Sequence, residues 1–483
     1  MTPLLGFAPD MEATTPGVIT DCEHFIPYLT GMEAAPTPET PTGAPPLAAD
    51  CRGAAVAVKL DNTRRVFGGT ATHMYELSGG VWVDRSRAGN YTGGADTRWS
   101  FTQFGDTTLI ANRADVIQRS AGAAFADIAT APKAEIIFAV GGQVMALNTN
   151  DGAEKPNGWH CSAIFDDTNW TPALATQAAR GLLVATPGPI SAGAKLGEYA
   201  IAYKNRSMYL GQYVGAPAVW DWTQVPGGDA GCVGKEALCD IDGAHFFVGP
   251  DNMWIFDGTR PNPVGNDQVR QWFYDSVSPQ NISKTKCIFD RQQNRVWVFY
   301  PSIGSTVCDS ALVFHVKGQK WGRSNREIQA VINYISSGVT FDTWNQYGAT
   351  YDDLPKVSYE SQFWLAGGAT LSFFNADNQL QSLTGNATDS SFTTGDAGDD
   401  ALVTMLSEIR LRFAAGKAPV SATATTYFKE QSGDAYTVGD VVPMENGKFN
   451  PRQSAQWHKA RFDVVGPTRV THINPTTKVT GQR

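Results

Sequence analysis

The sequence predicts an all-β protein whose main body is a β-propeller of six or more blades. The chain holds 48 glycines in 483 residues and is 11% aromatic but only 18% charged, a balance typical of turn-rich β structure. No sustained helical spacing of apolar residues is present. Short apolar runs instead recur as hairpins with a mean step of about 48 residues, which is close to one propeller blade.

The clearest hairpin spans residues 244–258. Residues 244–248 and 253–256 are aromatic and β-branched runs that favour a pleated, half-buried surface. Residues 249–252 read Gly-Pro-Asp-Asn, and Asp257-Gly258 follows the second run. Both segments consist of residues that favour turns, so this stretch predicts two antiparallel strands joined by one turn and followed by another.

Six such units follow one another within residues 51–381, the predicted propeller. Successive steps vary from 28 to 64 residues. Blades of similar size that carry loops of different length would produce such uneven spacing. A seventh unit is expected over Ser358–Leu365 and Leu371–Phe374. The second strands of the six units centre on Tyr75, Ile117, Met145, Tyr209, Ile255 and Val313.

Residues 1–50 predict an extended, proline-rich arm. They hold nine of the 27 prolines, and they contain seven acidic residues and no Lys or Arg. Proline disfavours helices and central strands. The arm is nevertheless too apolar for a solvated tail, so we expect it to lie on the core of its own chain or on a neighbouring subunit. The apolar residues are Leu4, Leu5, Phe7, Val18, Ile19, Phe25, Ile26, Tyr28 and Leu29.

After the propeller, the polar residues 382–400 predict a linker, and residues 401–483 predict a small β-sandwich or strands added to the propeller. Residues 408–413 and 457–464 alternate in polarity, and 421–428 is a third candidate strand. Residues 401–483 hold eleven Lys+Arg and six Asp+Glu. This net charge of +5 suits an acidic partner surface better than free DNA.

Charge and cysteine usage exclude several classes. The net charge of −9 argues against general affinity for nucleic acid or anionic membranes. The chain has no apolar run long enough for a membrane span and no basic segment before an apolar stretch, as a signal peptide would have. The seven cysteines are widely spaced without a C-x-x-C pair, which favours free thiols over a zinc site or disulfides.

No motif predicts catalysis, so we expect no catalytic, cofactor-binding or metal-binding residues. Phosphate-loop, zinc-protease and nucleophile-elbow motifs are all missing from the sequence. His245 and His315 lie in strand runs and are expected to be structural. Asp240-Ile241-Asp242-Gly243 would offer carboxylates to Ca²⁺ but is more typical of an acidic turn. Several aromatic residues would suit sugar stacking, although blade cores use the same types: Trp220, Trp222, Trp272, Tyr274, Trp344 and Tyr347.

Several stretches resemble the tail nozzle (hub) proteins of short-tailed bacteriophages. They are Gly243–Gly258, Pro261–Val264, Lys286–Asp290, Asn294–Pro301, Ala311–Val316 and Lys320-Trp321, together with Pro16–Cys22, Ile26-Pro27, Trp457–Val464 and Gly481–Arg483 at the two ends. The resemblance covers most of the chain in order. It carries no catalytic motif, because the family is structural.

The resemblance implies a non-enzymatic virion protein of a phage tail, assembled in the host cytoplasm. Its partners would be other copies of itself in a hexameric ring, a tail adaptor above, and tail fibre, spike or needle proteins. The ring would continue the DNA ejection channel below the portal and retain the packaged genome, without sequence-specific DNA binding, a cofactor or a membrane span. The alternatives are a carbohydrate-binding or glycan-degrading propeller that binds a receptor or acts as a depolymerase, and a cellular scaffold of kelch type.

Overall fold

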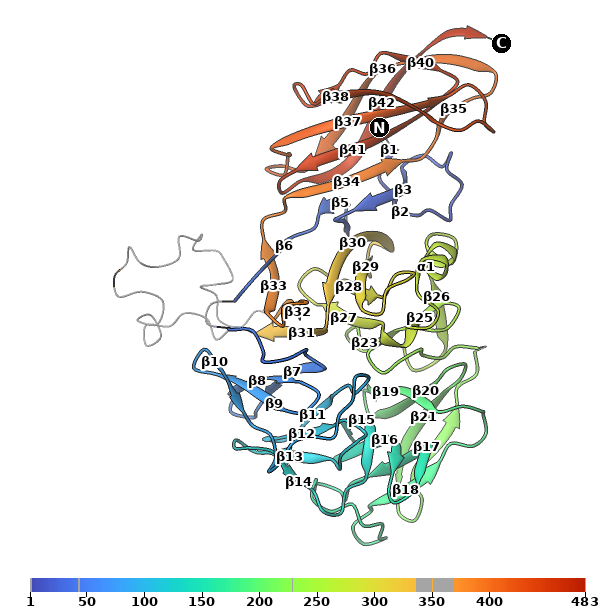
Figure 1. Cartoon of the computed structure of the whole chain (residues 1–483). Helices are drawn as coiled ribbons and strands as arrows, with labels where there is room; N and C mark the ends of the chain where they lie inside the picture. The colour runs from blue at the N-terminus through green and yellow to red at the C-terminus, as the bar shows by residue number, and fades with distance from the viewer. Residues whose placement is uncertain (1, 42–43, 228, 336–349, 351–368, 483) are drawn as a thin grey trace.

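The computed structural model describes residues 2–41, 44–227, 229–335, 350 and 369–482. It is almost wholly β, and its helical elements in those residues are α1 (Arg270–Ser276) and the 3₁₀ turn η1 (Ile282–Lys284). Figure 1 shows a propeller at one end of the molecule and a second β region at the other end. The predicted fold class, an all-β chain built around a propeller, is confirmed.

Six blades in the described part of the chain are each built from four strands that follow one another in sequence. Blade 1 is β7 (Gly53–Val58), β8 (Arg64–Gly69), β9 (Met74–Ser78) and β10 (Val81–Asp84). Blade 2 is β11 (Ser100–Phe104), β12 (Thr107–Ala111), β13 (Gln118–Ser120) and β14 (Ala126–Asp127). Blade 3 is β15 (Lys133–Val140), β16 (Gln143–Asn150), β17 (Glu154–Cys161) and β18 (Ala179–Leu182).

The second half of the propeller repeats this plan. Blade 4 is β19 (Ile190–Leu196), β20 (Tyr199–Lys204), β21 (Met208–Gly215) and β22 (Val219–Gln224). Blade 5 is β23 (Leu238–Asp240), β24 (His245–Val248), β25 (Met253–Phe256) and β26 (Pro261–Val264). Blade 6 is β27 (Lys286–Asp290), β28 (Arg295–Tyr300), β29 (Cys308–His315) and β30 (Lys320–Ile328).

A seventh, composite unit closes the circle. It joins β31 (Ala330–Ile335), β32 (Ala369–Phe374) and β33 (Leu380–Gly385) to β6 (Thr37–Glu39) of the N-terminal arm. The first strand of each unit contacts the first strand of the next, and β31 contacts β7. Residues from both ends of the propeller therefore share one sheet, so backbone hydrogen bonds fasten the ring. Leu371–Phe374 of the predicted seventh unit lies in β32, and Ser358–Leu365 lies outside the described residues.

The predicted hairpin is β24 and β25 of blade 5, with the Gly249 N–H donating to the Asn252 carbonyl at 2.7 Å. The uneven spacing of the units has a specific cause in blade 3. Met145 lies on the second strand, β16, whereas the equivalent third strand is β17 with Trp159. Steps from Ile117 to Trp159 and on to Tyr209 are 42 and 50 residues. The sequence did not predict β17 as a strand, because the first half of β17 is polar and largely exposed.

The C-terminal region is a β-sandwich completed by the arm. One sheet contains β36 (Leu402–Phe413), β39 (Lys448–Phe449), β40 (Gln453–Ala455) and β42 (Arg469–Gln482). The other contains β34 (Asp389–Thr394), β35 (Ala397–Gly398), β37 (Ser421–Lys429), β38 (Thr437–Pro443) and β41 (Trp457–Val465). Residues 382–400 therefore do not form the expected linker. They contain the end of β33 and the sandwich strands β34 and β35, which have too few apolar residues to be recognised as strands from the sequence.

The arm lies on its own chain in this structure. It forms β1 (Thr2–Pro3), β2 (Gly6–Phe7), β3 (Val18–Glu23), β4 (Phe25–Tyr28) and β5 (Gly31–Ala34) before reaching β6. β1 and β5 pair with β42, β2 and β3 join the second sandwich sheet, and β4 pairs with β30 of blade 6. The arm is therefore an integral part of both bodies.

Candidate functional site

The joint between propeller and sandwich is one continuous sheet. β30 of blade 6 pairs with β4 at Arg323 and Phe25, β4 forms a hairpin with β5, and β5 pairs with β42 at Glu33 and Arg469. The blade thus extends through the arm into the sandwich, with backbone hydrogen bonds at each step. A sheet resists bending about such a joint better than a flexible linker would.

The Glu33 carboxylate lies at the centre of this joint. Its Oε1 accepts a hydrogen bond from Arg295 of blade 6, and its Oε2 accepts from Nη2 and Nε of Arg469 at 2.6 and 2.8 Å. Tyr28 adds a cation–π contact, with the Arg469 guanidinium 3.4 Å from its ring centre. The Arg295 side chain is only 3% exposed, and its Nε donates to the Pro27 carbonyl at 2.7 Å. One carboxylate therefore fastens a propeller strand to a sandwich strand.

Two glycines allow the backbones at the joint to approach. A Cβ on Gly31, whose φ is +103°, would lie 2.2 Å from the Val470 carbonyl oxygen of β42. A Cβ on Gly322 of β30 would lie 2.6 Å from the Phe25 carbonyl oxygen. Real Cβ atoms do not approach that closely, so any side chain at these positions would push the arm away from its neighbours.

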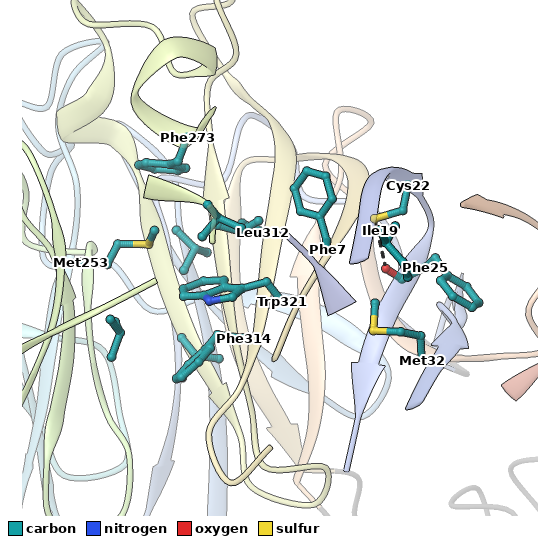
Figure 2. Packing of buried hydrophobic residues seen from close by; sticks show 14 of the residues in the cluster. Phe7, Ile19, Cys22, Phe25, Met32, Met253, Phe273, Leu312, Phe314 and Trp321 are labelled. Atoms are coloured by element: carbon teal, nitrogen blue, oxygen red, sulfur yellow. Dashed lines mark hydrogen bonds between the residues drawn. The ribbon is translucent and has the colours of Figure 1, made fainter. Parts of the chain in front are cut away.

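Apolar packing supports the same joint on both sides. Figure 2 shows Phe7 of the arm lying between Trp321 of blade 6 and the arm residues Ile19 and Cys22. On the sandwich side, Phe25 stacks on Phe392 with ring centres 4.7 Å apart. The arm residues Leu4, Phe7, Val18, Ile19, Phe25 and Ile26 are each at most 1% exposed, whereas Leu5 and Leu29 are 37% and 53% exposed.

Three of the seven acidic residues in the first 50 positions contact the propeller or the sandwich. Asp10 accepts hydrogen bonds from the Gln271 and Trp272 backbone N–H groups at the start of α1, at 2.6 and 2.9 Å. Asp21 pairs with Arg323, and Glu33 pairs with Arg295 and Arg469. These acidic side chains therefore serve contacts within the chain.

A cluster of charged side chains comes from the first strands of blades 3 and 6 and from the segments just before blades 2 and 5. Nζ of Lys235 donates to the Arg98 carbonyl at 2.6 Å and pairs with Glu135 at 2.8 Å. Glu236 pairs with Lys286, whose side chain is 3% exposed. Lys235 reaches from blade 5 to carbonyls before blade 2 and in blade 3, so these side chains span the axis and tie opposite blades together.

His245 and His315, which the sequence predicted to be structural, both make hydrogen bonds inside the protein. In His245, which is fully buried, Nε2 donates to the Lys195 carbonyl at 2.9 Å and Nδ1 accepts from the Tyr203 hydroxyl at 2.8 Å. This arrangement needs the neutral imidazole, and burial lowers the pKa of His245. Nδ1 of His315 accepts from the Gly318 N–H at 2.9 Å. Burial lowers the pKa of His315 as well.

The Asp240–Gly243 segment is a turn in which both carboxylates have partners. Asp240 accepts from the Gly243 N–H at 3.0 Å, and Asp242 pairs with Arg291 at 2.8 Å. Within the described residues, no group of three or more His, Cys, Asp or Glu side chains is placed to hold a metal ion.

The aromatic residues considered for sugar stacking are mostly packed. Trp220 is buried and donates to Gln143, and Trp222 packs near Trp159. Trp272 meets Phe7 of the arm edge-on, and the Tyr274 hydroxyl donates to the Gly249 carbonyl at 2.7 Å. Trp344 and Tyr347 lie outside the described residues.

All seven cysteines are free thiols, as the sequence predicted, and all except Cys239 are buried. Burial raises the pKa of these thiols, for example to about 12 in Cys232 and about 11 in Cys308. At neutral pH they are therefore protonated packing groups with little thiolate character.

Sequence reasoning missed the Glu33 cluster. Its partners Arg295 and Arg469 lie 262 and 436 positions away, so no local spacing connects them. The only signal was the contrast between an arm without cations and a C-terminal region with an excess of them.

The similarity of this chain to known proteins is low. No protein-family model matches the chain, and no curated protein matches it significantly. Among solved structures, YCF48 from Cyanidioschyzon merolae is 10% identical with a TM-score of 0.39, covering 70% of this chain and 96% of that one. YCF48 bound to D1 peptide is 11% identical with a TM-score of 0.38, covering 70% and 94%. The computationally designed Ika8 protein is 8% identical with a TM-score of 0.36, covering 69% and 99%.

The fold itself defines the class: this chain is a β-propeller protein with an added β-sandwich. In the described part of the chain, neither helical element has the length and apolar character that a membrane crossing requires.

Proposed function

We propose that this chain is a structural subunit of a bacteriophage tail nozzle, which acts without catalysis. The observation that supports this most is the continuous sheet from blade 6 through the arm to the sandwich, fastened by Glu33. It makes a stiff, two-part subunit suited to transmitting force between the neighbours it would join. The sequence resemblance to nozzle proteins adds independent support.

The DNA path in this proposal runs between copies and not through one propeller. Lys235, Arg98 and Glu135 meet across the propeller axis, so the axis of a single subunit is occupied by side chains. A ring of copies leaves a central opening, since heterologous contacts make closed rings when the rotation closes. The net charge of −9 favours a wall along which DNA slides without adhering.

The purified full-length chain provides the test. Light scattering and electron microscopy, with the chain alone and mixed with the adaptor of the same virus, should show closed rings, with six copies as the expected number. Monomers under all these conditions would overturn the proposal. Glycan-array binding or release of reducing ends from capsular polysaccharide by the monomer would instead favour the carbohydrate alternative.

A further inference from the structure

The loop between β17 and β18 of blade 3, residues 162–178, is long and tied down by buried contacts. Loops of more than about 12–15 residues are uncommon in compact domains and are often functional. Trp170, which is fully buried, anchors the middle of this blade 3 loop, and its Nε1 donates to the Asp167 carbonyl at 2.9 Å. The Asp167 carboxylate pairs with Arg119 of blade 2 at 2.8 Å. The loop is therefore held by two neighbouring blades.

The blade 3 loop nevertheless exposes two large apolar side chains. Phe165 and Leu174 are 79% and 66% exposed. The Ile164 N–H donates to the Thr176 carbonyl at 3.0 Å, so the two halves of the loop that carry these side chains run side by side. The remaining exposed apolar residues of the loop are Pro172, Ala173 and Ala175. We call these five exposed apolar residues the apolar tip.

Phe165 has a strained backbone. Its φ of +56° lies in the left-handed region, which is rare for a bulky side chain and costs free energy in the folded state. The Phe165 N–H donates to the Gly142 carbonyl at 2.7 Å, and a Cβ on Gly142 would lie 2.7 Å from the phenylalanine ring. The ring therefore lies against the β15–β16 turn. Glycine would adopt this backbone with less strain, so contacts within the chain give little reason for an exposed phenylalanine here.

The distribution of charge indicates the partner. The apolar tip contains no charged side chain, and the charged residues of the loop are Asp166 and Asp167. Asp167 pairs with Arg119, and the Asp166 carboxylate accepts from the Thr168 N–H and hydroxyl at 2.9 and 2.6 Å. Two copies that each carry −9 repel one another least where they meet through an uncharged surface. A basic partner would be drawn to the acidic parts of the chain instead, and nucleic acid would be repelled.

We propose that the apolar tip is a contact surface for a second copy of this chain, and that Phe165 packs into an apolar surface of that copy. The identity of the partner rests on the proposed function, because a ring requires each copy to bind another. Blade 3 lies at the end of the molecule away from the sandwich (Figure 1), so a contact there leaves the sandwich free for other tail proteins. A fixed, exposed aromatic side chain loses little entropy on binding and is typical of the residues that dominate an interface.

The test measures self-association of the purified full chain, alone and with the adaptor, by sedimentation over a series of concentrations. Phe165→Gly should weaken self-association at least about tenfold. Its urea midpoint should not change, because the relief of strain offsets the greater freedom of glycine in the unfolded chain. The matched control, Leu60→Gly, removes an equally exposed side chain from the β7–β8 turn of blade 1 and should change the affinity less than about twofold.

Three results would overturn the proposal: a wild-type chain that stays monomeric alone and with the adaptor, equal weakening by Phe165→Gly and Leu60→Gly, or binding of a non-associating wild-type chain to phosphatidylcholine vesicles that Phe165→Gly abolishes. Closed rings that Phe165→Gly leaves intact would refute this contact and leave the nozzle standing. Dimers that depend on Phe165 without any closed ring would support the contact and count against the nozzle.

Discussion

Replacing Glu33 by Gln should weaken the joint between propeller and sandwich. The substitution keeps the shape of the side chain but removes the charge that Arg295 and Arg469 share. Arg295 is 3% exposed, and breaking a buried ion pair by removing one partner costs about 3–5 kcal/mol. Arg295 still donates to Pro27, and Arg469 is 21% exposed, so we expect the low end, about 3 kcal/mol.

Urea unfolding monitored by fluorescence measures this loss. The matched control is Glu23→Gln, which changes an exposed carboxylate of the same arm that accepts from Asn325. It should alter the free energy of unfolding by less than about 0.5 kcal/mol. The double variant Glu33→Gln/Arg295→Met should be no less stable than Glu33→Gln, because no buried charge then lacks its partner.

Equal stability of Glu33→Gln and Glu23→Gln would refute this account of the joint. A large loss in Glu33→Gln that the double variant deepens by the full cost of a second substitution would refute the assigned coupling between Glu33 and Arg295.

Three further predictions concern the joint, the arm and pH. Gly31→Ala should cost at least about 2 kcal/mol because its Cβ would strike Val470, whereas Gly416→Ala, which also has positive φ but open space, should cost about 1 kcal/mol; equal losses in urea unfolding would contradict the steric argument. Deletion of residues 1–50 removes β6 and strands of both sandwich sheets, so limited proteolysis should digest the seventh, composite unit and the sandwich, and an intact remainder would show that the arm is dispensable. Burial lowers the pKa of His245 below its ordinary value near 6.5, so the folded state binds fewer protons than the unfolded chain, and stability falls as pH drops below about 6.5, by up to about 1.4 kcal/mol per unit. The urea midpoint of His245→Asn should depend less steeply on pH, and identical slopes would refute this.

The fold class, the hairpins of the blades and the alternation of β36 could be predicted from the sequence, because these features depend on neighbours in the chain. Turn residues and a two-residue period act locally, so Gly249 to Asn252 and Ile409 to Phe413 predict their own structure. The same reasoning predicted His245 as a structural residue. It failed at β17, whose first half is polar, and at residues 382–400, where strands form because the sandwich supplies their partners.

The position of the arm and the partners of its acidic residues could not be predicted from the sequence, because they depend on contacts between distant segments. Glu33 finds Arg295 and Arg469 because chain folding brings three distant segments into one sheet. The seventh unit is likewise completed by β6 from the other end of the propeller. Such contacts depend on the closure of the ring and on backbone approach at Gly31 and Gly322, and these are properties of the assembled chain that no local pattern of residues carries.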